Sequence, residues 1–266
     1  MEILRSPREI AQMRKAGLVV WEAFQRVRPL VRPGVTTGEI DAAIQQFFVE
    51  QHAEPLFKNY PNSTQGGPPF PAVTCISINR EVVHGIPGKR KIVEGDIVSI
   101  DTGCRLNGWC GDAATTFPVG HVDAECLRLV HATRDVLHMA IAEMGRHKWW
   151  SDVAEQMQDF VRNAGFSVVE DFVGHGIGRS MHEDPQVPNF TKRGFRHGRN
   201  DFRLVPGLII AVEPMVNMGT KDVRMLADQW TQVTADGRAS AHFEHTVAVT
   251  ESGPVVLTAG PSGESW

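Results

Sequence analysis

The sequence predicts a single domain of the α/β (α+β) class that spans residues 1–266 and consists of two similar halves, about 1–120 and 121–266. A chain of 266 residues is long for one simple core and short for two ordinary domains. Each half reads as two amphipathic helices followed by β-rich segments. This repeated order predicts two halves related by a pseudo-twofold axis, with a functional site between them.

The first two helices have clear boundary signals. Ser6 and Glu9 form a capping box with Pro7 at the first helical position, and Pro29 ends the helical spacing of apolar residues. The turn at residues 33–39 caps a second helix. Its expected inward-facing residues are Ile40, Ile44, Phe47 and Phe48.

A long loop and two strands follow these helices. Residues 60–71 are rich in Pro, Gly, Asn and Ser, which predicts a loop, and long loops in compact enzymes are usually functional. Strands are expected at residues 73–78 and 81–84, joined at Asn79-Arg80.

The second half repeats this order of elements. A helix is expected over residues 123–144, and Ser151 is expected to cap another that ends at Gly165. Strand-like segments follow at residues 168–173, 207–215, 228–234 and 241–250. No strong residue-by-residue repeat accompanies them, so the duplication rests on the order of elements alone.

The composition is that of an ordinary globular protein, with 42% hydrophobic and 22% charged residues. A net charge of −4 gives no electrostatic footprint for nucleic acid or an acidic membrane. The four cysteines include no C-x-x-C pair, which favours reduced thiols over a disulfide framework. The N-terminus lacks a signal-peptide pattern, and no apolar run is long enough to span a membrane, so a cytoplasmic protein is expected.

Residues 97–117 organise the first half. Asn107-Gly108 predicts a tight hairpin turn, which places Gly103 opposite Asp112. Asp101 and Asp112 then share one face as diagonal neighbours, and their carboxylates repel each other unless a positive charge lies between them. For an isolated pair, a polar hairpin edge with solvated acids is the simpler interpretation, and a one-residue bulge would change the register.

The second half adds an imidazole and two acids. His175 lies within Gly-His-Gly-Ile-Gly, where glycines allow close backbone approach; a dinucleotide loop is excluded because no G-x-G-x-x-G opens a helix here. Glu213 and Glu244 lie in apolar strand segments, where an unpaired carboxylate costs several kcal/mol and needs a cation or a proton.

Taken one at a time, each of these acids is better explained by a structural ion pair. Taken together, they form a set of four hard carboxylates and one imidazole: Asp101, Asp112, His175, Glu213 and Glu244. That set suits two divalent cations that share bridging carboxylates, with Mn, Fe(II) or Co more natural than a thiolate-type Zn site.

These motifs carry a family resemblance. The two aspartates eleven residues apart, Gly-His-Gly-Ile-Gly at 174–178, Val-Glu-Pro-Met at 212–215 and Phe-Glu-His-Thr at 243–246 resemble methionine aminopeptidases of bacterial type I, in the pita-bread metallopeptidase family. The similarity runs from the first helix to about Leu257. Only 37 residues separate His175 from Glu213, too few for the helical insertion of type II enzymes.

The resemblance implies a pita-bread fold, with an antiparallel curved sheet around a central dinuclear site that holds Co, Mn, Fe(II) or Zn. It implies removal of the initiator methionine from nascent polypeptides with a small second residue, by attack of metal-activated water on the methionine carbonyl. Asp101 would chelate one metal, and Asp112 and Glu244 would bridge both. His175 and Glu213 would complete the other, with Glu213 also the general base.

The resemblance also implies residues that contact the substrate. His84 would assist proton transfer to the leaving amine, and His182 would hydrogen-bond the substrate carbonyl. A small apolar pocket for the methionine thioether would be lined by Phe70, Cys75, Met181 and Trp230. A monovalent cation is expected near Asn79, Glu81 and Ser240.

The expected partners are the N-termini of nascent polypeptides near the ribosome. A monomer is expected, with no membrane binding and no specific binding of nucleic acid. The segment at residues 145–150 departs from the family pattern, and its paired tryptophans, Trp149 and Trp150, either pack locally or form an exposed docking patch. Two other functions remain open: an aminopeptidase acting before proline on the same scaffold, and a pita-bread module that binds peptides without catalysis. The retention of all five ligands argues against the binding module.

Overall fold

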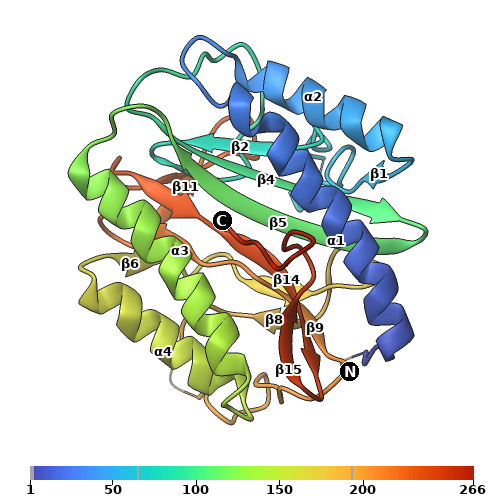
Figure 1. Ribbon diagram of the computed structural model, residues 1–266. Coiled ribbons are helices and arrows are strands. Elements are labelled where there is room, and N and C mark those ends of the chain that lie inside the picture. The colour runs from blue at the N-terminus through green and yellow to red at the C-terminus, as the bar shows by residue number, and fades with distance from the viewer. Residues whose placement is uncertain (1–2, 65, 193) are drawn as a thin grey trace.

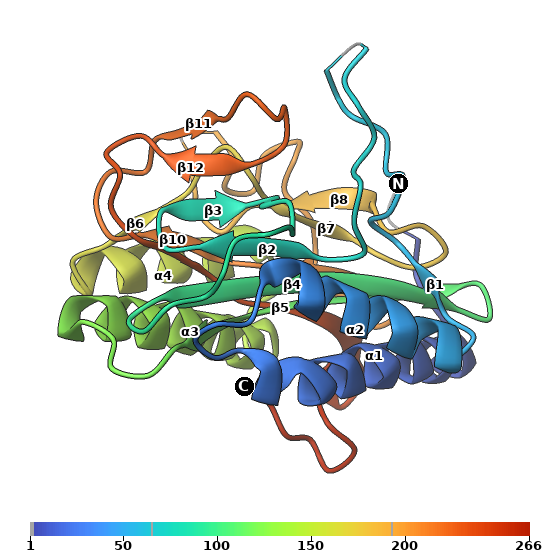
Figure 2. The same ribbon diagram turned by 90° about the horizontal axis from the view of Figure 1, so that it is seen from above.

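The described helices lie on one side of the molecule, where they contact a large antiparallel sheet and one of two small sheets; the other small sheet lies on the far side (Figures 1 and 2). A computed structural model describes residues 3–64, 66–192 and 194–266. Residues 1–2 of the N-terminal stretch and Gln65 of the expected loop lie outside the described residues. The described part of 60–71 contains no helix or strand, as predicted.

The helices are α1 (Pro7–Val27), α2 (Thr37–Glu50), α3 (Ala124–Met144) and α4 (Trp150–Asn163), and a short 3-10 turn, η1 (Arg28–Leu30), follows α1. Ser6 and Thr36 cap α1 and α2 through complete capping boxes, and Asp123 accepts two backbone N–H groups at the start of α3. The four inward-facing residues predicted for α2 are all buried.

The start of α4 differs from the prediction, because Trp149 occupies the cap position and Ser151 lies inside the first turn. The backbone N–H and hydroxyl of Ser151 both donate to the carboxylate of Asp201, at 3.1 and 2.6 Å. The carboxylate of a residue distant in the sequence therefore accepts a hydrogen bond from the first turn of α4, where a local N-cap side chain was expected to do so. Trp150 is fully buried, stacks on Phe202 and donates to the Pro188 carbonyl, so it packs locally.

The main sheet joins the two halves. Its strands run in the order β1 (Glu54–Pro55), β4 (Ile97–Leu106), β5 (Trp109–Pro118), β14 (Glu244–Thr250), β9 (Ile209–Val212), β7 (Gly174–Gly176) and β8 (Glu183–Val187), with β2 (Cys75–Ile78) paired to β4 and β15 (Gly253–Val256) paired to β14. Every pairing among these described strands is antiparallel. The β5–β14 contact connects the first half to the second.

The small sheets consist of β13 (Ser240–His242), β10 (Met215–Asn217) and β6 (Ser167–Val168), and of β11 (Val223–Met225), β12 (Gln232–Thr234) and β3 (Glu81–Val83). The two strands expected around Asn79-Arg80 are present, but β2 and β3 do not pair with each other. Strand β2 joins the main sheet and β3 pairs with β12. The left-handed backbone of Asn79, at φ 58°, lies where the chain passes from one sheet to the other.

The hairpin register is confirmed pair by pair. Leu106 faces Trp109, Gly103 faces Asp112 and Asp101 faces Ala114. Asn107 and Gly108 both have positive φ, at 51° and 76°, as a two-residue turn of this type requires.

Several strands of the second half are shorter than predicted. The segment 168–173 contributes only its first residue to β6, and the glycine-flanked His175 lies within a short strand of its own, β7. The segment 228–234 becomes a strand only at Gln232, because the Asp228 carboxylate accepts the backbone N–H groups of Trp230 and Thr231 in a turn.

Two other predicted strands are each divided in two. The segment 207–215 is interrupted at Glu213-Pro214, since proline has no N–H for a ladder. The segment 241–250 is interrupted at Phe243, whose N–H donates to the Pro214 carbonyl. Both interruptions adjoin predicted metal ligands.

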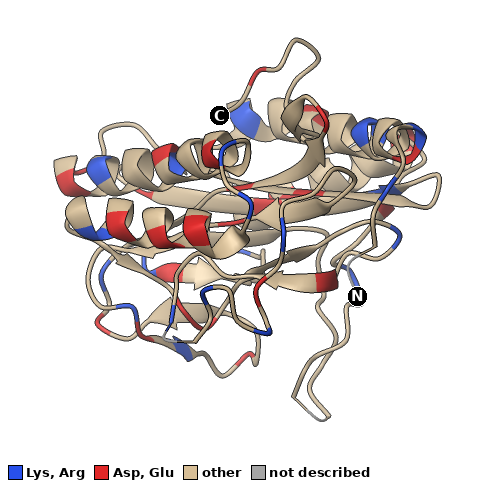
Figure 3. Cartoon of the chain, turned by 90° about the horizontal axis from the view of Figure 1, so that it is seen from below, with Lys and Arg blue, Asp and Glu red and all other residues tan. Residues whose placement is uncertain are grey.

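The apolar core has one large cluster under α1 and α2 and another under α3 and α4. Both basic and acidic residues occur along the outer helices (Figure 3), which agrees with the small net charge of −4. No helix among the described residues is long and apolar enough to cross a membrane.

Candidate metal centre

The five predicted ligands come from five consecutive strands of the main sheet. Asp101 lies on β4, Asp112 on β5, Glu244 at the start of β14 and His175 on β7, and Glu213 directly follows β9. Residues from both halves of the sequence therefore meet on one stretch of the sheet.

The strand register explains why three carboxylates share a face. Ala114 is paired with Asp101 on one side and with Glu244 on the other, so these side chains form a row across three strands. Asp112, two residues from Ala114 along β5, projects from the same face because side chains alternate along a strand.

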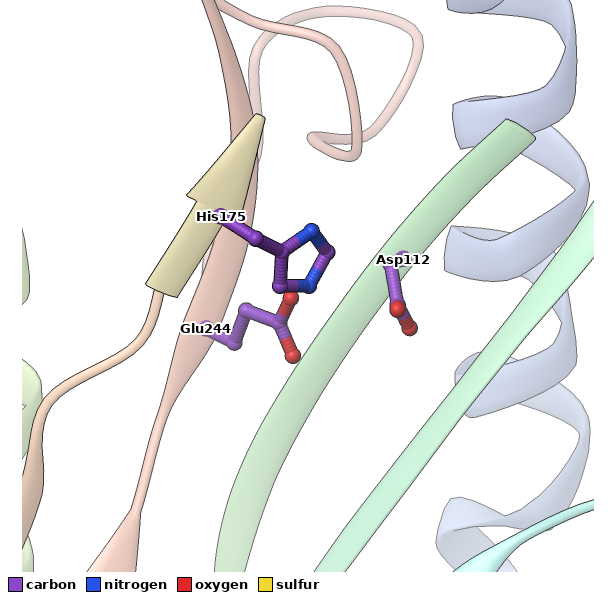
Figure 4. A group of neighbouring side chains, drawn as sticks. All are labelled: Asp112, His175 and Glu244. Atoms are coloured by element: carbon purple, nitrogen blue, oxygen red, sulfur yellow. The ribbon is translucent and has the colours of Figure 1, made fainter. Parts of the chain in front are cut away.

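The ligand atoms of Asp112, His175 and Glu244 all lie within 4.8 Å of one another. Figure 4 shows these side chains converging from β5, β7 and β14. Glu213 Oε1 is 3.6 Å from His175 Nε2, and Asp101 lines the same cavity. The structure thus brings all five residues to one cavity, with three of them in the tightest group.

Three of the four acids each have a buried carboxylate oxygen that makes no hydrogen bond among the described residues. These oxygens are Asp101 Oδ1, Asp112 Oδ1 and Glu244 Oε1. Burial raises the pKa of Asp112 to about 8. Burial, and then the charge of Asp112, also raises the pKa of Asp101, Glu213 and Glu244 well above the usual carboxyl range. Such a cluster needs protons or cations.

His175 presents a nitrogen suited to a cation. Its Nδ1 lies 2.9 Å from the carbonyl oxygen of Gly176, which can only accept a hydrogen bond. The Nδ1–H tautomer leaves the lone pair of Nε2 directed at the acids. Burial lowers the pKa of His175 to about 3, so the imidazole is neutral, the form in which it binds metals.

A cavity of about 260 Å³ adjoins this group. The predicted substrate-contacting residues all line it: His84, His182, Phe70, Cys75, Met181 and Trp230. The rings of Phe70 and Trp230 meet edge to face, with centroids 5.2 Å apart. Burial lowers the pKa of His84 to about 4, so its imidazole is neutral near pH 7.

Sequence reasoning missed several residues of this cavity wall, among them His242 and Phe172. His242 is buried, and its Nε2 lies 3.9 Å from Glu213 Oε2 with no hydrogen-bond partner among the described residues. Phe172 packs edge-on against His84 at 5.4 Å between ring centroids. His242 had a signal in the sequence, since it lies two residues before Glu244 in an apolar segment; Phe172 had none.

The comparisons with known proteins agree with this geometry. The sequence profile of metallopeptidase family M24 matches residues 11–251. A methionine aminopeptidase from Clostridium perfringens is 46% identical over 258 residues, which cover 97% of this chain and 99% of that protein. The chain belongs to the methionine aminopeptidases of metallopeptidase family M24.

Two further relatives place the chain within that family. Methionine aminopeptidase 1 of Bacillus subtilis is 42% identical, with 97% of this chain and 99% of that protein covered. The crystal structure of the Thermotoga maritima methionine aminopeptidase superposes with a TM-score of 0.89 at 42% identity, covering 97% of this chain and 99% of that one. The expected bacterial type I assignment and the pita-bread fold are both confirmed.

Proposed function

We propose that the chain removes N-terminal methionine from polypeptides with a small second residue, as a metal-dependent aminopeptidase. The observation that carries this proposal is the meeting of Asp112, His175 and Glu244 within 4.8 Å beside an apolar cavity. The methionine aminopeptidases of Clostridium perfringens and Bacillus subtilis support it, because they match this chain over nearly its full length.

The donor set fits divalent cations. Three buried carboxylate oxygens without partners and Nε2 of His175 form a site that a cation would complete. Membership of a metallopeptidase family implies divalent metal ions. Bound there, such ions polarise a substrate carbonyl and lower the pKa of water.

We infer the roles of the ligands from the resemblance and the sheet register. Asp101 would chelate one of two ions, Asp112 and Glu244 would bridge both, and His175 and Glu213 would complete the other. Oxygen-rich ligation is suited to Mn, Fe(II) or Co, with Zn as a further candidate.

Three residues of the chain would handle protons and charge. Glu213 would accept the proton of the attacking water. His182 would donate a hydrogen bond to the methionine carbonyl, and His84 would assist proton transfer to the leaving amine. All three line the cavity.

The methionine side chain would occupy the apolar part of the cavity, against Phe70, Cys75, Met181 and Trp230. Burial raises the pKa of the Cys75 thiol well above its ordinary value, so Cys75 contributes a neutral, polarisable surface. A flexible thioether fits such a surface without a polar partner.

We also infer that residues 1–266 form a single catalytic domain of two pseudo-halves, which the shared main sheet supports. The substrates would be nascent polypeptides near the ribosome, handled by a monomer in the cytoplasm. A monovalent cation near Asn79, Glu81 and Ser240 stays a prediction. Ser240 N–H donates to the Asn79 carbonyl, but the Glu81 carboxylate is already paired with Arg90.

A peptide panel tests the proposal. The protein should release methionine from Met-Ala-Ser, much less from Met-Phe-Ser, and almost nothing from Ala-Pro peptides. Chelation should abolish release, and a divalent ion should restore it. Release from X-Pro peptides alone would favour an aminopeptidase that acts before proline. No turnover with any divalent ion would favour a module that binds peptides without catalysis.

A further inference from the structure

Tyr60 reaches the cavity from the base of the loop at residues 60–71. Its hydroxyl oxygen lies 2.6 Å from Nδ1 of His182, and the two rings meet edge to face with centroids 5.3 Å apart. Tyr60 is the only tyrosine of the chain. A short hydrogen bond to the ring nitrogen that faces away from the substrate is the usual way in which a protein sets the tautomer of a functional histidine.

The backbone holds Tyr60 in this position. Its N–H donates to the Phe57 carbonyl at 2.9 Å, and its carbonyl accepts the N–H of Phe70, also at 2.9 Å. The N–H of Asn59 donates to the Phe70 carbonyl at 2.8 Å. These bonds close the loop at its neck, so the phenol is presented to His182 by a fixed segment.

A second set of contacts connects the loop to residues 229–230, away from His182. The Asn62 amide donates to the Gln229 carbonyl at 3.0 Å, and the Trp230 indole donates to the Pro68 carbonyl at 2.9 Å. Neither contact touches His182. Closure of the loop over the cavity and the bond to His182 can therefore be disturbed independently.

We propose that Tyr60 is a positioning residue for His182, whose hydroxyl donates to Nδ1 and so holds the ring proton on Nε2. The inference rests on the proposed function, in which His182 donates to the methionine carbonyl. A neutral imidazole has one N–H, and a carbonyl oxygen can only accept. His182 can serve the substrate through Nε2 only if Nδ1 is the acceptor, which requires Tyr60 to be the donor.

A neighbouring ring holds His182 in this orientation. The ring of His175 packs against His182 with centroids 4.3 Å apart, and this contact restricts rotation of the His182 ring. Without the Tyr60 hydroxyl, part of the population would carry the proton on Nδ1 and point a lone pair at the substrate carbonyl.

The test compares Tyr60→Phe with Asn62→Ala. The first removes one hydroxyl and keeps the ring; the second releases the loop from Gln229 and leaves His182 untouched. In Tyr60→Phe, kcat for Met-Ala-Ser should fall about 10- to 100-fold, the range typical of a lost partner behind a functional histidine, with KM changed less than twofold. Asn62→Ala should keep kcat within about twofold. Equal losses of kcat in both variants, or a change confined to KM, would overturn the inference.

Nitrogen-15 NMR of histidine-labelled, zinc-loaded protein gives a readout that is independent of activity. The His182 signals, identified by their loss in His182→Gln, should show a protonated Nε2 and an unprotonated Nδ1, and Tyr60→Phe should increase the Nδ1–H form. A protonated Nδ1 in the unmodified protein would overturn the inference even if the enzyme is active. If the protein releases no methionine, the tautomer result still decides the role of Tyr60.

The single tyrosine allows a second check. Protein made with 3-fluorotyrosine has one fluorine site, at Tyr60. Its fluorine resonance should move in His182→Gln and stay in place in Asn62→Ala. An unchanged resonance in His182→Gln would contradict the hydrogen bond.

Discussion

Gly103 lies directly opposite Asp112 in the β4–β5 hairpin, and a Cβ atom at Gly103 would approach Asp112 Oδ1 to 2.7 Å. Among the described residues, that oxygen is one of the buried atoms without a partner in the candidate metal centre. The missing side chain at position 103 therefore leaves the space in which the Asp112 carboxylate turns toward His175 and Glu244.

Gly103→Ala should displace the Asp112 carboxylate and lower kcat/KM for Met-Ala-Ser by about 100-fold, because a shift near 1 Å in a catalytic group has an effect of that size. Gly88→Ala is the matched control, since nothing lies within 4 Å of a Cβ atom there and its backbone has no positive φ. Steady-state kinetics measure both variants. Activity in Gly103→Ala equal to that of Gly88→Ala would contradict the steric account.

Asp112→Asn and Glu244→Gln should each abolish methionine release and yet stabilise the metal-free protein. Each replaces a buried carboxylate whose pKa is raised by burial with a neutral amide of similar shape. Thermal melts in chelator at pH 8 should show a higher Tm for both variants than for the unmodified protein. A lower Tm would mean that these acids are satisfied without metal.

The metal-free protein should lose stability as pH rises from about 7 to 8. In the unfolded chain Asp112 titrates near 3.8, whereas burial raises its folded pKa to about 8, so stability present at low pH is lost as pH rises through the folded value. The buried histidines, such as His84, have lowered pKa values, so they make the stability rise with pH. This opposite effect is confined to pH values below about 6.5. Across this pH window, the Tm measured in chelator should fall as pH rises, and the Tm measured with Mn(II) should stay nearly constant. A rising Tm in chelator would refute the assignment.

The buried ion pair between Arg5 and Glu183 should support the segment that carries Met181 and His182. Arg5 Nη2 lies 2.6 Å from Glu183 Oε2, and Glu183 Oε1 accepts the backbone N–H groups of Arg179 and Ser180. Arg5→Ala should lower the free energy of unfolding by roughly 3 kcal/mol, because it leaves a buried carboxylate unpaired.

The exposed pair of Arg26 and Glu50 provides the control for this experiment. Their side chains are 51% and 39% exposed, and Arg26→Ala should change the free energy of unfolding by less than about 1 kcal/mol. Denaturant unfolding of the two variants measures the difference. Equal effects would show that the Arg5 pair is no stronger than a surface pair.

Local signals predicted the helix starts and the long hairpin of the first half, but not the pairing of β2 and β3 with different sheets. The capping boxes at Ser6 and Thr36 and the Asn107-Gly108 turn act within a few residues, so the sequence determines the helix starts and the whole hairpin register. Asp101 and Asp112 could be placed on one face for the same reason.

The second half depends more on contacts between distant residues. Asp201 takes the place of a local cap at Ser151, and Pro214 divides a strand whose apolar pattern runs on. The meeting of His175, Glu213 and Glu244 with the hairpin depends on the β5–β14 and β9–β14 pairings, which no local pattern encodes. The family motifs predicted that these residues meet at one site. They did not predict His242, because it lies outside the motifs.

Reconstitution of the metal-free protein with Mn(II) tests the metal centre most directly. Free methionine released from Met-Ala-Ser is measured before and after the ion is added, in the unmodified protein and in Asp112→Asn. The account predicts no release without metal, full release after two equivalents of Mn(II), and none in Asp112→Asn at any concentration. Release that survives chelation, or near-normal release by Asp112→Asn, would contradict it.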